Sequence, residues 1–114
     1  MENLSFREYQ IRSKTFAEYP KDWENPAPIY PYLGLTEEAG EVAGKMAKVI
    51  RDKRIYMTPD EEAGILAECG DVLWNLSQIV NDLGYDLEDV ARDNLTKLKD
   101  RKERGVIKGT GDKR

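Results

Sequence analysis

Apolar residues recur along this chain at the three- and four-residue spacing of a helix, without the alternation that is typical of strands. The first such stretch follows Ser5, which begins a capping-box pattern with Glu8 three residues later. Its apolar stripe reaches Phe16, and we expect this helix to end near Pro20. The proline-rich residues 20–31 then predict an irregular loop.

Two longer helices follow this loop. The first is predicted over residues 32–52, with its apolar side chains on one face. The next begins with a Thr58 cap, a proline at the following position and Glu61 at the third helical position. It ends at Leu83, because Gly84 is a suitable C-terminal cap. This helix is the most hydrophobic segment, and its broad apolar stripe predicts contact with more than one partner helix.

The last helix is predicted from a cap at Asp86 to Gly105. Residues 105–114 are polar and glycine-containing, so we expect a mobile C-terminal tail. A chain of 114 residues fits a single domain, residues 1–114, with a modest core. The expected fold class is all-α, in a four-helix bundle-like arrangement.

Composition excludes several classes of function. The net charge of −4 argues against a nucleic-acid partner, although residues 97–114 are rich in lysine and arginine. The chain has no histidine, which excludes histidine-based acid–base chemistry and the Glu-x-x-His pairs of diiron bundles. No segment resembles a signal peptide or a membrane span, and Cys69 is the only cysteine. We therefore expect a cytoplasmic protein without a membrane partner.

Carboxylates occur in pairs at helical spacing on the two longest predicted helices. Glu38 and Glu41 form one pair, and Glu68 and Asp71 form the other. The three-residue spacing places both members of a pair on the same side of a helix. Like charges at this spacing destabilise a helix unless something offsets them. Two such helices side by side would build an all-oxygen site suited to Mg²⁺.

A solvated charged surface is the competing interpretation of these acidic residues. Glu41 and Lys45 have the four-residue spacing of an ordinary helical ion pair, and Glu37 points further toward solvent. Both interpretations stay open on the residue pattern alone, because a carboxylate at a core boundary is costly unless a cation or metal accompanies it.

The fourth predicted helix carries Asn94, Lys97 and Arg101. The two cations complement phosphate oxygens, but a solvated basic face near a helix C-terminus gives the same pattern. Four aromatic side chains are candidates for a base-stacking pocket, and they serve equally well as core or subunit interface. They are Trp23, Tyr30, Tyr32 and Trp74.

Taken together, these motifs resemble the MazG-like all-α nucleoside triphosphate pyrophosphohydrolases, in particular the small single-domain type found in bacteria and phages. The matching segments are Glu37-Glu38-x-x-Glu41 within residues 32–51, Glu8-Tyr9-Gln10 with Thr15, Glu68-x-x-Asp71-Val72-Leu73-Trp74, Asn94-x-x-Lys97-Leu98-x-x-Arg101, and Arg104-Gly105 with Gly109-Thr110-Gly111-Asp112-Lys113-Arg114. Two positions depart from the family pattern: Glu37, where glycine is frequent, and Asn75, where an aromatic residue is frequent.

The resemblance implies hydrolysis of a nucleoside triphosphate to the monophosphate and pyrophosphate, with Mg²⁺ as cofactor and Mn²⁺ as a substitute. It also implies a homodimer or homotetramer. The implied metal ligands are Glu38, Glu41, Glu68 and Asp71. The implied catalytic base is Glu37 or Glu41. The implied substrate contacts are Lys48, Arg51, Asn94, Lys97 and Arg101.

Two alternatives stay open on the sequence. A related member of the superfamily would act on dUTP, dUDP or phosphoribosyl-ATP, because base preference is not legible in these motifs. A non-catalytic helical module that binds nucleotide or protein would keep the fold, but it has no evident need for the complete set of four carboxylates.

Overall fold

The protein is all-helical throughout the part that its structure describes. The computed structural model describes residues 3–21 and 28–114, and within these ranges it contains no strand. The helices are α1 (Phe6–Lys14), α2 (Tyr30–Arg51), α3 (Pro59–Leu83) and α4 (Leu87–Glu103). This confirms the all-α class predicted from the sequence.

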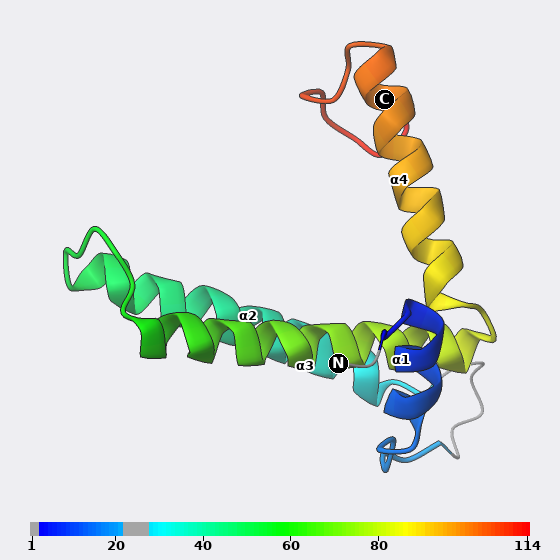
Figure 1. Ribbon diagram of the computed structural model, residues 1–114, viewed down its shortest axis with the longest axis horizontal. Coiled ribbons are helices and arrows are strands. Elements are labelled where there is room, and N and C mark those ends of the chain that lie inside the picture. Colours follow the sequence, from blue (N-terminus) through cyan, green and yellow to red (C-terminus); the bar gives the residue numbers. More distant parts are fainter. Residues whose placement is uncertain (1–2, 22–27) are drawn as a thin grey trace.

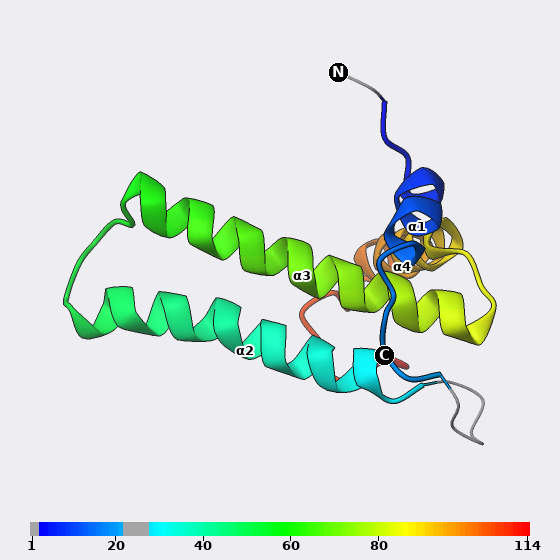
Figure 2. The ribbon, with the colours of Figure 1, turned by 90° about the horizontal axis from the view of Figure 1, so that it is seen from below.

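The two long helices, α2 and α3, form an antiparallel hairpin (Figures 1 and 2). The predicted capping box at the start of α3 is confirmed. Thr58 Oγ1 accepts the Glu61 amide at 3.2 Å, and Glu61 Oε1 accepts the Thr58 amide at 3.0 Å. Helix α3 ends as predicted at Gly84, whose φ of 83° is left-handed and therefore favours glycine.

Helix α1 begins as predicted and ends earlier than predicted. Ser5 Oγ accepts the Glu8 amide at 3.1 Å, which is the expected N-terminal cap. The helix stops at Lys14, not near Pro20. Both the backbone amide and the hydroxyl of Thr15 donate to the Arg12 carbonyl, so the last turn closes there.

A polar interface holds α1 against α3. Ser77 and Gln78 on α3 are fully buried, and both lie within 3.0 Å of the Ser13 hydroxyl of α1. Gln10 adds hydrogen bonds at 2.8 Å to Asn81 Oδ1 and to the Tyr85 carbonyl. Among the described residues, the buried hydrophobic side chains are few: Tyr19, Val49 and Leu87. Hydrogen bonds therefore position α1 more than apolar burial does.

Helix α4 extends away from the α2–α3 hairpin, and only its beginning lies near the other helices (Figure 1). Within the described residues it contacts α1 and α3, and it makes no contact with α2. One chain is thus more open than the four-helix bundle-like packing expected from the sequence. A short turn after Gly84 fixes the beginning of α4, and the rest of the helix packs against no other helix among the described residues.

The C-terminal residues fold back on α4, and the mobility that the sequence predicts for this tail stays a prediction. Asp112 Oδ1 lies 2.9 Å from Lys97 Nζ and 3.0 Å from an Arg101 guanidinium nitrogen. Arg114 Nε donates to the Val106 carbonyl at 3.0 Å. These contacts depend on the turn at Gly105, with φ of 72°, which returns the chain along the helix. No helix of the described residues is both long and apolar enough to span a membrane.

Candidate metal centre

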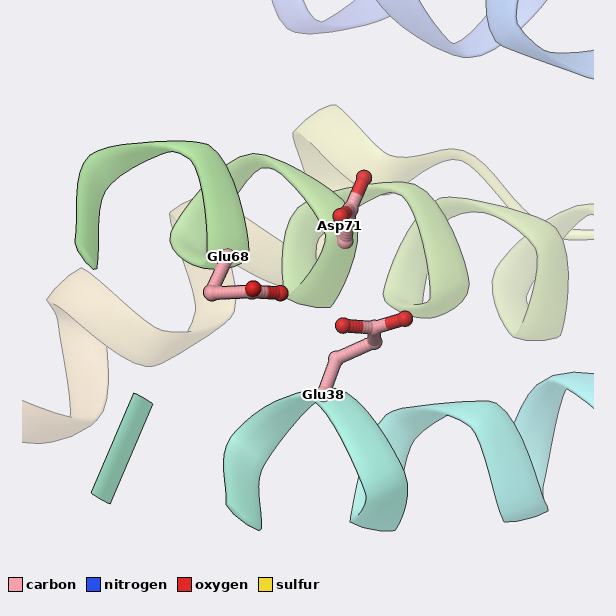
Figure 3. A group of neighbouring side chains, drawn as sticks. All are labelled: Glu38, Glu68 and Asp71. Carbon is pink, nitrogen blue, oxygen red and sulfur yellow. The ribbon is translucent and has the colours of Figure 1, made fainter. Parts of the chain in front are cut away.

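Three of the carboxylates predicted as metal ligands meet between α2 and α3. Glu38 projects from α2 toward Glu68 and Asp71 on α3 (Figure 3). One oxygen of each carboxylate lies within 4.8 Å of the corresponding oxygens of the other two. Glu38 and Glu68 are half-buried, and Asp71 is exposed. We call these three residues the acidic cluster.

The acidic cluster carries more negative charge than its surroundings balance. The pKa of Glu38 is raised to about 7, first by its hydrogen bond with Glu68, then by partial burial and by the charges of Asp71, Glu68 and Glu37. Lys45 is the cation nearest to Glu68, at 3.5 Å. A proton shared between Glu38 and Glu68 therefore relieves the repulsion, and a divalent cation would relieve it more completely.

The donor set of the acidic cluster suits a hard divalent cation. All three groups are carboxylates from rigid helices, and the exposed side at Asp71 leaves room for water ligands. Mg²⁺ and Mn²⁺ prefer oxygen ligands, and Mg²⁺ keeps several of its waters in proteins. The absence of histidine from the whole chain is consistent with this preference. The residues present therefore fit the metal that the sequence motifs imply.

The other site residues predicted on α2 lie outside the acidic cluster. Glu41 is one turn beyond Glu38 on α2 and is exposed, as is Glu37. Lys48 lines a cleft between α2 and α3. Arg51 Nε lies 3.0 Å from Asp52 Oδ1 at the end of α2. The roles of these residues stay predictions.

The predicted phosphate contacts on α4 are not brought to the acidic cluster within one chain. Asn94 is exposed, while Lys97 and Arg101 bind Asp112 of the tail. Arg101 is buried beneath this contact, with 6% of its surface exposed. Asp112 has a lowered pKa because it accepts hydrogen bonds from both cations. These three substrate contacts also stay predictions.

An aromatic cavity of about 320 Å³ lies near the junction of α1, α2 and α3. Tyr30 and Trp74, two of the predicted base-stacking residues, line it together with Tyr19. Tyr19 stacks on Tyr30 at 5.7 Å between ring centroids and meets Trp74 edge-on at 6.2 Å. Tyr32 is exposed, and Trp23 lies outside the described residues. Tyr19 was missed by the sequence pattern, because it follows the end of α1 in an irregular segment.

Asn75 occupies a constrained position one turn beyond Asp71. It is 4% exposed, and its Nδ2 donates to the Asp71 carbonyl at 2.9 Å. Its Oδ1 is buried without a hydrogen-bond partner among the described residues. A Cβ at Gly34 of α2 would lie 2.3 Å from this oxygen, so only glycine allows the approach of the two helices here. The contact between Asn75 and Gly34 could not be predicted from the sequence.

The fold and the acidic cluster together define an all-α protein with a candidate divalent-cation centre. Residues 29–106 match the model of the MazG nucleotide pyrophosphohydrolase domain. The chain is also 42% identical over 109 residues to the Gene 37 protein of Mycobacterium phage L5, covering 93% of this chain and 96% of that protein. The protein therefore belongs to the MazG nucleotide pyrophosphohydrolase family. No solved structure matches the chain.

Proposed function

We propose that the protein is a Mg²⁺-dependent nucleoside triphosphate pyrophosphohydrolase that cleaves the α–β bond of NTPs or dNTPs. The products are the nucleoside monophosphate and pyrophosphate. The observation that carries the proposal is the meeting of Glu38, Glu68 and Asp71 across the α2–α3 hairpin, in a chain of the MazG family.

The acidic cluster is the proposed binding site for Mg²⁺, for which Mn²⁺ can substitute, and Glu41 is the proposed fourth carboxylate. When bound, the ion would neutralise the triphosphate and lower the pKa of coordinated water. Glu41 lies one turn along α2 from Glu38, on the same side of the helix, which supports its place at the edge of the site.

Water attacks the α-phosphorus in the proposed reaction, and the bond from that phosphorus to the α–β bridging oxygen breaks. Glu37 or Glu41 would accept the water proton, since both are exposed carboxylates on the same helix as Glu38. Cationic or amide side chains would bind the triphosphate and stabilise charge on the departing pyrophosphate. These are Lys48, Arg51, Asn94, Lys97 and Arg101.

The aromatic cavity is the proposed site for the base. Tyr19, Tyr30 and Trp74 offer ring faces and edges to a planar group. Trp74 is on α3 three residues after Asp71, so the cavity and the acidic cluster share one helix. Stacking on aromatic side chains accepts every base, so this cavity does not by itself select one base.

A homodimer or homotetramer is the proposed assembly. Large apolar side chains on α3 and α4 are exposed in the single chain, among them Leu66 at 69% and Leu95 at 67%. Exposed apolar surface of this kind marks interaction sites. A second copy would cover α4 and supply basic side chains to a neighbouring acidic cluster, which the α4 of the same chain does not approach.

The direct experiment is incubation of the purified protein with each of the eight common NTPs and dNTPs, and with dUTP, dUDP and phosphoribosyl-ATP, in Mg²⁺ or in EDTA, followed by separation of the products. We expect monophosphate and pyrophosphate only with Mg²⁺. Diphosphate and orthophosphate would move the cleavage to the β–γ bond. Turnover only of dUTP, dUDP or phosphoribosyl-ATP would assign a related activity, and no turnover at all would favour a binding module.

Variants connect this activity to the acidic cluster. Glu38→Gln, Glu68→Gln and Asp71→Asn should each nearly abolish turnover and leave the helical content unchanged. The matched control is Glu62→Gln, an exposed carboxylate on the same helix α3 but outside the cluster. Wild-type rates for Glu38→Gln would contradict the assignment.

A further inference from the structure

Lys45 reaches across the hairpin to the edge of the acidic cluster. It lies seven residues after Glu38 on α2, so both side chains face α3. Its Nζ is 3.5 Å from Glu68 Oε1. A Cβ at Gly64 would lie only 3.8–3.9 Å from the end of this side chain, which places the lysine stem directly against α3. The sequence pattern paired Lys45 with Glu41 on its own helix, and the structure pairs it with Glu68 on the other.

A cleft of about 290 Å³ lies at Lys45, between α2 and α3. Lys45, Lys48, Asp60, Glu61 and Gly64 line it. The carboxylate of Glu61 is already bound by the Arg54 guanidinium and by the Thr58 amide. Once Lys45 leaves Glu68, two lysines would face the cleft against one carboxylate, Asp60, that has no described cationic partner, and the cleft would then be cationic beside the acidic cluster.

The position of Lys45 creates a competition for Glu68. An ammonium group and a divalent cation cannot share one carboxylate at full strength, because each repels the other. A half-exposed lysine–carboxylate pair is also a weak interaction, so a divalent ion can displace it readily. The displaced ammonium group would then lie between the acidic cluster and the α2–α3 cleft, which Lys45 already lines.

We propose that Lys45 exchanges partners when substrate binds: it neutralises Glu68 before the metal ion arrives and then binds a phosphate oxygen of the nucleotide in the α2–α3 cleft. This role rests on the proposed function, because it requires both a metal ion at the acidic cluster and a polyphosphate beside it. It makes Lys45 a substrate-binding residue as well as a counter-ion of the empty cluster.

Opposite changes in two affinities test this exchange. In Lys45→Met, Mn²⁺ alone should bind about two- to fivefold more tightly, because its competitor for Glu68 is removed. Inorganic tripolyphosphate, offered at saturating Mg²⁺, should bind about tenfold more weakly, because a charged hydrogen-bond donor is lost. Titration calorimetry measures both affinities without turnover, and tripolyphosphate avoids any dependence on the base.

Lys45→Arg should keep both affinities close to wild type, since it restores the charge. Lys53→Met is the matched control for loss of one positive charge, because Lys53 is exposed in the α2–α3 connection outside the cleft. We expect it to change neither affinity. Circular dichroism shows whether each variant keeps its helices.

Two results would overturn the exchange. If Lys45→Met weakens Mn²⁺ and tripolyphosphate together, the lysine only maintains the local structure. If it changes neither, the lysine is a bystander. Failure of the proposed function is a separate result: wild-type protein would then bind Mn²⁺ no more tightly than Glu68→Gln does.

Discussion

The Gln10 side chain accepts the backbone amide of Leu87 at 2.7 Å, so a residue of α1 caps the N-terminus of α4. Asp86, the cap predicted from the sequence, makes no side-chain capping hydrogen bond. The same glutamine donates to Asn81 and to the Tyr85 carbonyl. One buried amide thus connects three helices where the chain turns from α3 into α4.

Removing this amide should destabilise the protein. Gln10→Ala leaves the buried Leu87 amide without its partner, which costs about 1–3 kcal/mol, and it also removes the donor to the Tyr85 carbonyl. We expect faster hydrogen exchange at the beginning of α4 and a lower free energy of unfolding in urea. Ile11→Ala is the control, because Ile11 is the next residue of α1 and is 66% exposed. Equal effects of the two substitutions would show that the amide is not the connection.

Close contact between Gly34 and Asn75 predicts a position-specific cost of adding a methyl group. Gly34→Ala should destabilise by about 1–3 kcal/mol, because the new Cβ meets the buried Asn75 Oδ1. It should also weaken Mn²⁺ binding, since Asn75 holds the carbonyl of Asp71. Gly40→Ala, with open space at its Cβ, should instead stabilise the helix by about 0.5–1 kcal/mol.

The double variant Gly34→Ala with Asn75→Ala separates contact from helix propensity. Truncation of Asn75 removes the clash, so the two losses should not add in urea denaturation. Additive losses would contradict the contact.

The raised pKa of Glu38 predicts that stability depends on pH in the absence of metal. The folded state holds this proton to about pH 7, above the ordinary value of 4.5. The stabilisation that this proton gives to the folded state is therefore complete below about pH 4.5, and it is lost as pH rises through about 7. The charged groups responsible for the raised pKa of Glu38 are Glu68, Asp71 and Glu37.

Thermal unfolding in EDTA should consequently show a falling Tm between about pH 5 and about pH 8. Mg²⁺ should remove much of the fall, because the ion replaces the proton between the carboxylates. Glu38→Gln cannot titrate at this position, so its Tm should be flatter over the same range. A wild-type profile identical to that of Glu38→Gln would refute the shared proton.

The contact of Asp112 with Lys97 and Arg101 predicts how the C-terminal residues are held. Asp112→Asn removes the charge that both cations bind. Hydrogen exchange over residues 105–114 should accelerate. The midpoint of global unfolding should change little, because Asp112 itself is exposed and the buried Arg101 keeps its hydrogen bond to the Asp112 carbonyl. Lys113→Gln is the neighbouring control and should leave the exchange unchanged. Fast exchange in the wild type would show that the contact does not persist.

Local signals in the sequence predicted the elements well. The caps at Ser5, Thr58 and Gly84 act over three or four residues, so their motifs contain all the information that they need. The side chain that caps α4 could not be predicted from a local motif, because Gln10 lies 77 residues away from Leu87. The end of α1 was placed too late for a related reason: hydrophobic spacing continues past the turn at Thr15.

Helical spacing predicted that Glu68 and Asp71 share one side of a helix, and the antiparallel hairpin places Glu38 opposite both. What spacing does not contain is the crossing of the helices. The partner of Lys45 and the Gly34–Asn75 contact depend on that crossing, so neither could be predicted from the sequence. The direction of α4 likewise depends on tertiary contacts that its own sequence does not specify.

The polar interface between α1 and α3 has a consequence for folding specificity. An apolar interface tolerates a shift of one turn, because any methyl group can replace another. Ser77 and Gln78 tolerate no such shift, since moving α1 would leave their fully buried polar groups without Ser13. The interface therefore selects one register of α1, and the position of Tyr19 beyond the end of that helix follows from this register.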